Sequence, residues 1–302
     1  MTDPKKVNFT VIIPTYNRAE IALDTLIALN DQSVKGFKVI VVDQSESIFS
    51  EIRDFKSSSY DYTYLHLDLP SLPNARNVGI ENTTTEFAIF LDDDCIPDTE
   101  LIASYVRIFA AVDKNTALIA GRVIEKGSNI FKEGKDLVGG FVTRYGKTLK
   151  NFDTDASGKC EWAPGGNFGV RTAAFREVGG FDSNFIGTAV MEDSDFGYSI
   201  RRIGYEVMYD PRPSMVHLRI PTGGLRQTKP ARAMEYRAHN SVYFFRKHGL
   251  RRFLPLVSLY TIAIAIKEWL LGNYSASGIY YSYTGFVRGM HTEVQPINDN
   301  EK

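Results

Sequence analysis

Hydrophobic and polar positions in the first 45 residues follow a strand, helix, strand pattern. The β-branched run Phe9–Pro14 ends at a proline, which is typical of a buried strand. The segment Ala19–Asp31 repeats apolar residues at nearly helical spacing, and Phe37–Val42 is a second apolar run. Together they predict a β-α-β unit, whose strands are parallel and whose crossover is right-handed.

The same two periodicities continue to about residue 218 and predict an α/β fold with a mainly parallel central sheet. We expect a helix with a polar end over Ser47–Ser59 and a loop that turns into a helix over Leu72–Gly79. Between Val123 and Lys159 the pattern weakens, which indicates loops and short elements. The other predicted elements are the strands Tyr62–Leu67, Glu86–Leu91, Phe168–Val170, Val207–Asp210 and Ser214–Leu218 and the helix Ser194–Ile203.

Three consecutive carboxylates, Asp92, Asp93 and Asp94, follow the apolar strand at residues 86–91. In open α/β sheets, ligands bind outside the carboxyl ends of the strands. Asp92 and Asp94 can converge on one hard cation, and Mg²⁺ or Mn²⁺ held in this way usually also binds substrate phosphates. The alternative is an acidic cap on a following helix, with Pro97 in its first turn. From the residues alone, both interpretations stay open.

Composition narrows the class of protein. The 302 residues are 43% hydrophobic, which suits one large domain or a domain with an appendage. A net charge of −1 argues against a nucleic-acid-binding protein. Cys95 and Cys160 are too few for a disulfide framework, and the polar segment 1–8 lacks the apolar core of a secretory signal. We therefore expect a cytoplasmic protein that binds no nucleic acid.

Two other polar side chains of the first half are candidates for ligand contacts. Asp43 follows the second predicted strand without a glycine-rich phosphate loop before it, so a G-x-G-x-x-G dinucleotide site is disfavoured. Its carboxylate can accept the ring N–H of a pyrimidine base, or it can form a turn. Arg76 lies near a predicted helix start, where it can bind phosphate or face solvent.

Candidate residues of the second half also have purely structural interpretations. Gly165 and Gly166 allow close backbone approach to a sugar, or they form a tight turn. Glu192 and Asp193 precede a helix, which an acid can cap. His217 ends an apolar strand, where a lone histidine is more often a hydrogen-bonded core residue than a ligand.

Four ordered motifs resemble those of family 2 glycosyltransferases of the GT-A type: VIIPTYNR, VIVVDQS, LPNARNVGI and FAIFLDDDCIP. The resemblance continues through APGGNFGVRTAAFREVGGFDSNF, MEDSDFGYSIRRIGYEVMYDP and MVHLR, and so covers most of Phe9–Arg219. It implies a GT-A nucleotide-binding sandwich over residues 1–220. The nucleotide-sugar half would span residues 1–120, and the acceptor half would span residues 121–220.

The resemblance also implies roles at a donor site. Asp43 would meet the nucleotide base, with uracil favoured, and Arg76 would lie near the donor. Asp92 and Asp94 would form the D-x-D site for ribose, diphosphate and a divalent cation, Mn²⁺ or Mg²⁺. The remaining residues of the expected nucleotide pocket are Pro14, Tyr16, Arg18 and Asp93.

Three residues of the second half receive roles from the same resemblance. Asp193 would be the general base that takes the proton of an acceptor hydroxyl, and the positive end of its helix should keep it ionised. Glu192 would position the acceptor or the neighbouring backbone. His217 would complete the metal site as a neutral imidazole.

The chain after Arg219 differs in composition. From Arg219 to Arg252 it holds nine Lys or Arg and one acid. Ile220–Arg232 is expected to be a basic lid or a basic linker, and a basic amphipathic helix follows. Phe253–Ile266 is almost wholly apolar, which is short for a membrane span and suits an interfacial or buried helix. We expect this helical appendage, residues 221–302, to contact the inner face of the membrane, or to pack on the core or on a second subunit.

These features predict an inverting, metal-dependent glycosyltransferase. It would move a sugar from a nucleoside diphosphate, UDP favoured, to a hydroxyl of a glycan or lipid-linked acceptor in cell-surface polysaccharide synthesis. Two alternatives stay open. A metal-dependent phosphotransferase or nucleotidyltransferase uses similar carboxylates, although its aspartyl-nucleophile form favours a hydroxyl where this chain has Ile96. A non-catalytic nucleotide-sugar-binding scaffold would lack turnover, and the intact Glu192–Asp193 pair argues against it.

Overall fold

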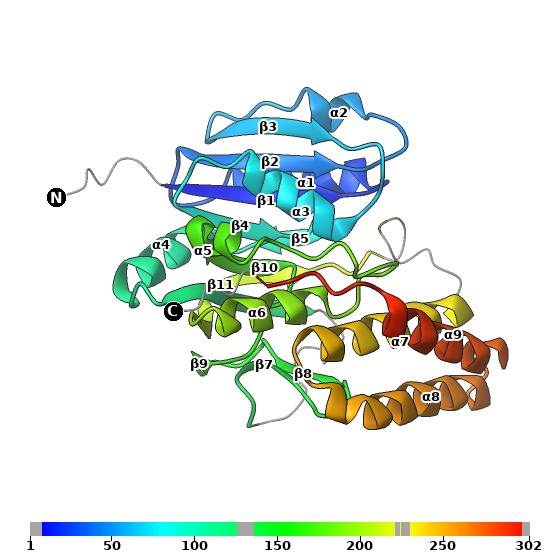
Figure 1. Ribbon diagram of the computed structural model, residues 1–302. Helices are drawn as coiled ribbons and strands as arrows, with labels where there is room; N and C mark the ends of the chain where they lie inside the picture. Colours follow the sequence, from blue (N-terminus) through cyan, green and yellow to red (C-terminus); the bar gives the residue numbers. More distant parts are fainter. Residues whose placement is uncertain (1–7, 126–135, 221–223, 225–229, 298–302) are drawn as a thin grey trace.

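The computed structural model describes residues 8–125, 136–220, 224 and 230–297. Its centre is a nine-stranded sheet. The strands of this sheet are β1 (Phe9–Thr15), β2 (Phe37–Asp43), β3 (Tyr60–His66), β4 (Phe87–Leu91), β5 (Cys95–Pro97), β6 (Thr116–Glu125), β9 (Gly158–Lys159), β10 (Asn167–Arg171) and β11 (Glu206–His217). Their order is β3-β2-β1-β4-β10-β6-β11-β5, and β9 pairs with β11 (Figure 1). Strands β5, β9 and β10 run against their neighbours, while the other six share one direction.

Helices cover both faces of the sheet, which explains why the central strands are continuous apolar runs rather than alternating ones. The helices of this part are α1 (Ala19–Leu29), α2 (Ser50–Arg53), α3 (Leu72–Glu81), α4 (Leu101–Ala111), α5 (Thr172–Glu177) and α6 (Glu192–Arg202). Apolar residues of α1 and α4 join one core, and those of α3, α5 and α6 face the other side of the sheet (Figure 1). The predicted α/β sandwich with a mostly parallel sheet is confirmed.

The strand order contains a switch point between β1 and β4. After β1 the chain adds β2 and β3 on one side, and it then places β4 on the other side of β1. Crevices at the carboxyl ends of strands form at such points. The carboxylates that follow Leu91 therefore lie where this topology leaves room for a ligand.

Several local predictions were wrong. The helix expected over Ser47–Ser59 is a single turn, α2. Leu72–Gly79 is helical from its first residue, because Ser71 caps α3 by accepting a hydrogen bond from the backbone of Asn74 at 3.4 Å. The two closing strands are one strand, β11, with a break in register between Tyr209 and Ser214. Pro97 ends β5 and begins no helix, so the acids before it are not a helix cap.

Between β6 and β10 the described residues form short elements, as expected. A separate two-stranded sheet joins β7 (Gly139–Val142) to β8 (Thr148–Asn151). Ala163 to Asn167 then leads into β10, which runs antiparallel between β4 and β6. This hairpin and this turn bring residues of the second half over the carboxyl ends of β1 and β4.

Three helices follow the sheet domain: α7 (Pro230–Lys247), α8 (Leu254–Leu270) and α9 (Ser277–His291), with a 3₁₀ turn, η2 (Arg251–Phe253), before α8. The predicted apolar face of α7 is buried, and its members are Met234, Ala238, Val242 and Phe245. The junction with the sheet domain includes a buried ion cluster, in which Lys247 Nζ lies 2.9 Å from Asp182 Oδ2 and 2.8 Å from Asp195 Oδ2. Most of the expected lid, Ile220–Arg232, lies outside the described residues.

Candidate active site

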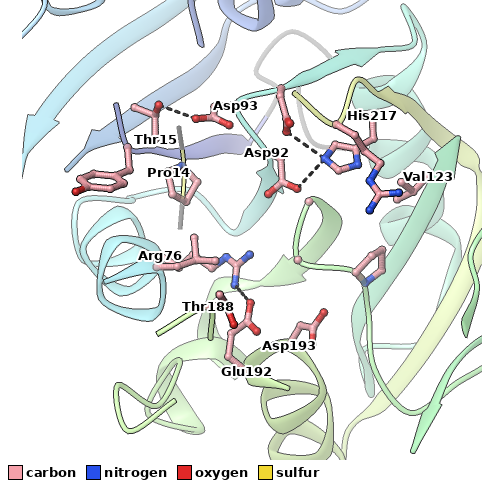
Figure 2. Close-up of a pocket in the computed structure, with 18 of the residues that line it drawn as sticks. Pro14, Thr15, Arg76, Asp92, Asp93, Val123, Thr188, Glu192, Asp193 and His217 are labelled. Atoms are coloured by element: carbon pink, nitrogen blue, oxygen red, sulfur yellow. Dashed lines mark hydrogen bonds and ion pairs between the residues drawn. The ribbon is translucent and has the colours of Figure 1, made fainter. Parts of the chain in front are cut away.

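A pocket of about 360 Å³ opens at the switch point of the sheet. It gathers side chains from both halves of the sheet domain (Figure 2). Among the described residues that line it are nearly all of the sequence-predicted site residues: Pro14, Tyr16, Arg18, Arg76, Asp92, Asp93, Asp94, Glu192, Asp193 and His217. Asp43 is missing from this lining. Residues predicted from separate motifs therefore meet in one cavity.

Asp92, Asp94 and His217 form a set of ligand atoms that fits a divalent cation. One oxygen or nitrogen from each lies within 4.8 Å of the others. His217 Nε2 is 3.1 Å from Asp94 Oδ1 and 3.7 Å from Asp92 Oδ2. Adjacent ligands on an octahedral ion with bonds of about 2.1 Å lie about 3 Å apart, and two carboxylates with an imidazole suit Mn²⁺ or Mg²⁺. The residues present thus fit the predicted metal.

The glycine pair before β10 is explained by what it touches. A Cβ on Gly166 would lie 2.3 Å from Asp92 Oδ2, and a Cβ on Gly165 would lie 2.3 Å from Arg76 Nη2. Any larger side chain would displace one of these two groups. Both glycines line the pocket, so close approach of the backbone to functional side chains is the reason for them.

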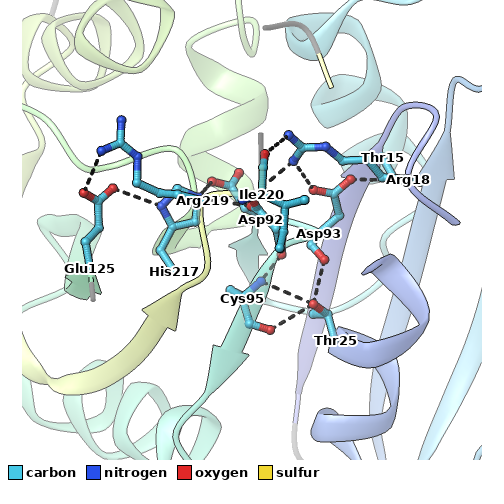
Figure 3. A network of polar contacts seen from close by, with 11 residues as sticks. Thr15, Arg18, Thr25, Asp92, Asp93, Cys95, Glu125, His217, Arg219 and Ile220 are labelled. Atoms are coloured by element: carbon cyan, nitrogen blue, oxygen red, sulfur yellow. Dashed lines mark hydrogen bonds and ion pairs between the residues drawn. The ribbon is translucent and has the colours of Figure 1, made fainter. Parts of the chain in front are cut away.

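Asp93, unlike the acids on either side of it, lies outside the set of ligand atoms that fits a cation, and protein groups hold its carboxylate. Thr15 Oγ1 donates to Asp93 Oδ2 at 2.7 Å, and Arg18 Nη1 pairs with Asp93 Oδ1 at 3.1 Å (Figure 3). Burial raises the pKa of Asp93 to about 7, against the effects of Thr15 and Arg18. Arg18 also pairs with Asp94 and donates to the carbonyl of Ile220 at 2.9 Å. Arg18 therefore ties the end of β1 to the acidic turn and to the segment after β11.

Glu125, at the end of β6, is a site residue that the sequence did not reveal. Its Oε1 lies 3.1 Å from Nδ1 of His217, the residue opposite it in the β6–β11 register (Figure 3). A carboxylate on one ring nitrogen orients a histidine and directs the other nitrogen to a metal. Arg219 Nη1 in turn lies 3.4 Å from Glu125 Oε2. Burial lowers the pKa of His217, but its hydrogen bond to Asp94 and the charge of Asp92 outweigh burial and raise it.

Glu192 and Asp193 occupy the first turn of α6, across the pocket from the metal-ligand set (Figure 2). Arg76 Nη1 lies 2.7 Å from Glu192 Oε1. Asp193 Oδ1 accepts a hydrogen bond from the backbone of Ser194 at 2.7 Å. The helix begins after Met191, which has a positive φ of 75°. That sharp entry turns both carboxylates toward the cavity.

Burial governs the ionisation of this acid pair. It raises the pKa of Glu192 to about 7, and the charge of Asp193 adds to that rise. Burial also raises the pKa of Asp193, although Arg76 and Lys150 act in the opposite direction. The sequence-based expectation that the helix terminus keeps Asp193 ionised is therefore incomplete, because desolvation outweighs the neighbouring charges and the backbone hydrogen bonds that lower this pKa. A raised pKa suits a group that must accept a proton near neutral pH.

Other lining residues had no sequence signal, or a weak one. Lys150 on β8 and Trp162 come from the second half of the sheet domain, and Thr188 precedes α6. Gln44, which follows Asp43 in the chain, lines the pocket from the first half. Lys150 lies in the stretch Val123–Lys159, which has no clear periodicity, and Trp162 follows shortly after it. Only the folded structure therefore shows that both side chains reach the cavity.

Asp43 lies behind the pocket rather than on its wall. Its side chain is fully buried, with Oδ1 accepting from the backbone of Ser45 at 2.9 Å and Oδ2 accepting from the hydroxyl of Tyr64 at 2.7 Å. These bonds fix the loop that carries Gln44. The contact of Asp43 with a base stays a prediction.

The sequence of this chain matches a known protein family. The family described as glycosyl transferase family 2 matches residues 10–179, which is more than half of the chain. This chain belongs to glycosyl transferase family 2. Membership confirms the resemblance of the motifs and the assignment of a glycosyltransferase enzyme. It sets aside the phosphotransferase and the non-catalytic scaffold as alternatives.

Relatives of this glycosyltransferase include larger proteins. The pre-mycofactocin glycosyltransferase of Mycobacterium tuberculosis is 29% identical over 222 residues, which cover 71% of this chain and 43% of the relative. Chondroitin synthase of Escherichia coli is 28% identical over 87% of this chain and 43% of its own length. The chain thus spans less than half the length of these relatives.

Solved structures share the fold at low sequence identity. One is a mannosyltransferase from Pyrobaculum calidifontis in complex with GDP-Man and Mn²⁺. Its TM-score is 0.58 at 17% identity, and the similarity covers 94% of this chain and 87% of that chain. Residues 1–349 of TarS from S. aureus have a TM-score of 0.60 at 14% identity over 94% of this chain and 81% of that chain. These similarities establish the GT-A fold.

Proposed function

We propose that this enzyme is an inverting, divalent-metal-dependent glycosyltransferase that acts on a nucleoside diphosphate sugar. The observation that carries the proposal is the shared pocket, in which the Asp92, Asp94 and His217 ligand set faces Asp193 across the cavity. These ligands would hold Mn²⁺ or Mg²⁺, which would stabilise the negative charge of a departing diphosphate. The likeness to a structure that contains GDP-Man and Mn²⁺ supports this assignment.

Asp193 is the proposed general base. The oxygen of an acceptor hydroxyl attacks the anomeric carbon, and its proton passes to the Asp193 carboxylate. The bond from that carbon to the diphosphate oxygen breaks, and the electron pair leaves with the nucleoside diphosphate. One displacement inverts the configuration, so no carboxylate nucleophile is required. Glu192, fixed by Arg76, would position the acceptor beside Asp193.

Donor residues are proposed from the same pocket. Pro14, Tyr16 and Arg18 would line the nucleotide, and Arg76 would lie beside the sugar or diphosphate. Asp93 would act indirectly, because it holds Arg18 in place. We favour a UDP-sugar, on the expectation that Asp43 or its loop meets the base.

Acceptor and cellular role are proposals of the same kind. The acceptor would be a hydroxyl of a glycan or of a lipid-linked saccharide, in cell-surface polysaccharide synthesis on the cytoplasmic side. Similar proteins bear the names chondroitin synthase and amylovoran biosynthesis glycosyltransferase, which supports a polysaccharide context. We propose residues 1–220 as the glycosyltransferase domain and residues 221–302 as its helical appendage.

A thermal-shift panel tests the donor site. UDP-, dTDP- and GDP-sugars are added with and without Mn²⁺ or Mg²⁺, because a ligand that binds only the native state raises the melting temperature. We expect a metal-dependent rise with a UDP-sugar, which Asp94→Ala removes. Equal shifts with and without metal, or no shift on folded protein, would contradict the metal-dependent donor site. A shift confined to a GDP-sugar would overturn the UDP assignment alone.

A further inference from the structure

Helix α8 carries several large apolar side chains on its outer face. Its buried positions are Leu254, Val257, Thr261 and Ala265, of which the last two are small. The exposed positions include Leu256, Leu259, Ile266 and Leu270, of which Leu259 is 66% and Leu270 73% exposed. A surface helix of a soluble domain normally shows the opposite pattern, with polar residues outward. The outward stripe therefore needs an apolar partner.

The neighbouring helix and the connecting turn also expose apolar side chains. Tyr280, Tyr283, Val287 and Met290 recur at spacings of three and four residues along α9, and all are exposed. Trp269 and Leu271 are exposed where α8 ends. Figure 1 shows α8 and α9 extending to one side, away from the nine-stranded sheet. Aromatic side chains at the ends of apolar helices are typical of the membrane–water interface.

The net charge of the helical region indicates which kind of partner would cover this apolar surface. Residues 230–291 hold eight Lys or Arg and two Asp or Glu, whereas the rest of the chain holds 27 and 34. One of the eight, Lys247, is buried against Asp182 and Asp195, which leaves seven for the surface. Arg251, Arg252 and Lys267 are exposed on η2 and α8, beside the apolar stripe. A basic segment of this kind is attracted to the anionic lipids of a membrane. In a symmetric contact with a second copy, the same excess of positive charge would face itself and repel.

We propose that the outward face of α8 and α9 binds an anionic lipid bilayer by lying in its interface. By length and composition Arg251–Leu270 can cross a membrane, with 20 residues and a mean hydropathy of 1.5, but the buried stripe of α8 packs in the three-helix group. Spanning would remove that packing, whereas lying on the surface keeps it. Bound in this way, the enzyme would work next to lipid-linked acceptors. The inference rests on the surface alone and not on the proposed donor.

Tryptophan fluorescence with vesicles tests the proposal. The chain has two tryptophans, of which Trp162 is 3% and Trp269 45% exposed, so a change on binding reports Trp269. Vesicles of phosphatidylcholine with about one third phosphatidylglycerol should shift its emission to shorter wavelength, and pure phosphatidylcholine should do so far less. Trp269→Phe should remove the shift while flotation with the vesicles persists. No donor or metal is present, so the outcome is independent of catalysis.

Variants separate the apolar and electrostatic parts of binding. Leu259→Glu with Leu270→Glu should abolish flotation, and Ile27→Glu, which is exposed on α1 in the sheet domain, should not change it. Arg251→Gln with Arg252→Gln should weaken binding about tenfold or more without touching the apolar stripe. Absence of binding by folded wild-type protein would overturn the proposal. A dimer in analytical ultracentrifugation that Leu259→Glu dissociates would also overturn it, in favour of a second copy.

Discussion

Charged side chains are usually exposed in a folded protein and large apolar ones are usually buried. The pocket buries charged side chains, whereas the outer face of α8 exposes large apolar ones. At the pocket, carboxylates and cations are buried, and groups such as Asp93, Glu192 and Glu125 are held by charged partners. On α8, large aliphatic side chains such as Leu259 face solvent. Each arrangement costs stability in an isolated chain. The two proposals would explain both, because buried charge would prepare a site for an ionic ligand and exposed apolar surface would prepare one for lipid.

The largest effect should follow from removing the proposed base, Asp193. Asp193→Asn keeps the shape of the side chain but not its basicity, so transfer should fall about 10³-fold. Nucleotide-sugar binding, measured by the metal-dependent thermal shift, should not change, because the metal-ligand set lies across the pocket. Asp24→Asn, an exposed acid on α1, is the matched control. Turnover near that of wild type would remove Asp193 from the role.

The buried ion cluster that joins α7 to the sheet domain should contribute strongly to stability. Lys247→Met leaves Asp182 and Asp195 without their shared cation, and it should lower the free energy of unfolding by about 3–5 kcal/mol. Lys159→Met is the control, since Lys159 makes an exposed pair with Glu206 that should contribute less than about 1 kcal/mol. Urea unfolding compares the two. Equal losses would mean that the buried cluster does not anchor α7 to the sheet domain.

The glycine pair offers a test in which each variant controls for the other. Gly166→Ala places a methyl group against Asp92 and should weaken Mn²⁺ binding about 10- to 100-fold. Gly165→Ala presses instead on Arg76, so it should reduce turnover and leave Mn²⁺ affinity nearly unchanged. Titration of Mn²⁺ by calorimetry or electron paramagnetic resonance gives the affinities. Equal loss of affinity in both variants would show that the turn acts as a unit.

A smaller effect is expected in the pH profile. The pKa values of Glu192 and Asp193 are raised, that of Glu192 to about 7, and a base must be deprotonated, so kcat/KM should fall as the pH decreases through this range. Arg76 opposes the rise in both pKa values. Arg76→Met should therefore move the acidic limb to higher pH by up to about one unit. Arg76→Lys should move it less, and an unmoved limb in Arg76→Met would assign the limb to other groups.

The pocket could be predicted from sequence largely because its signals are local. An apolar run followed by Asp92, Asp93 and Asp94 indicates a strand that ends in charged residues, and this signal does not depend on residues elsewhere in the sequence. Glu125 gave no such signal. It meets His217, 92 positions later, only through the register of β6 and β11. Lys150 likewise reaches the cavity through a hairpin in a stretch with little periodicity.

The glycine pair and α8 show a second limit of sequence interpretation. A tight turn at Gly165 and Gly166 can be inferred, but the groups that a Cβ would strike come from α3 and from the end of β4. For α8 the apolar composition predicts a helix, yet a helix with apolar residues on several faces does not reveal which face is covered. Packing against the other two helices covers Leu254, Val257, Thr261 and Ala265, and large side chains such as Leu259 and Leu270 are left outside.

The smallest expected effect tests whether the outer face of α8 is free in solution. Leu254 is 8% exposed and Leu259 66% exposed on the same helix. Leu254→Ala should lower the free energy of unfolding by about 2–5 kcal/mol, because it leaves a cavity. Leu259→Ala removes the same atoms from a solvated position and should change it by less than about 0.5 kcal/mol. With anionic vesicles present, only Leu259→Ala should lose lipid binding in proportion to its lost apolar area. A large loss of stability in Leu259→Ala without lipid would mean that protein covers this face of α8. The face would then be an ordinary protein contact and would no longer contrast with the pocket as a surface left free for a ligand.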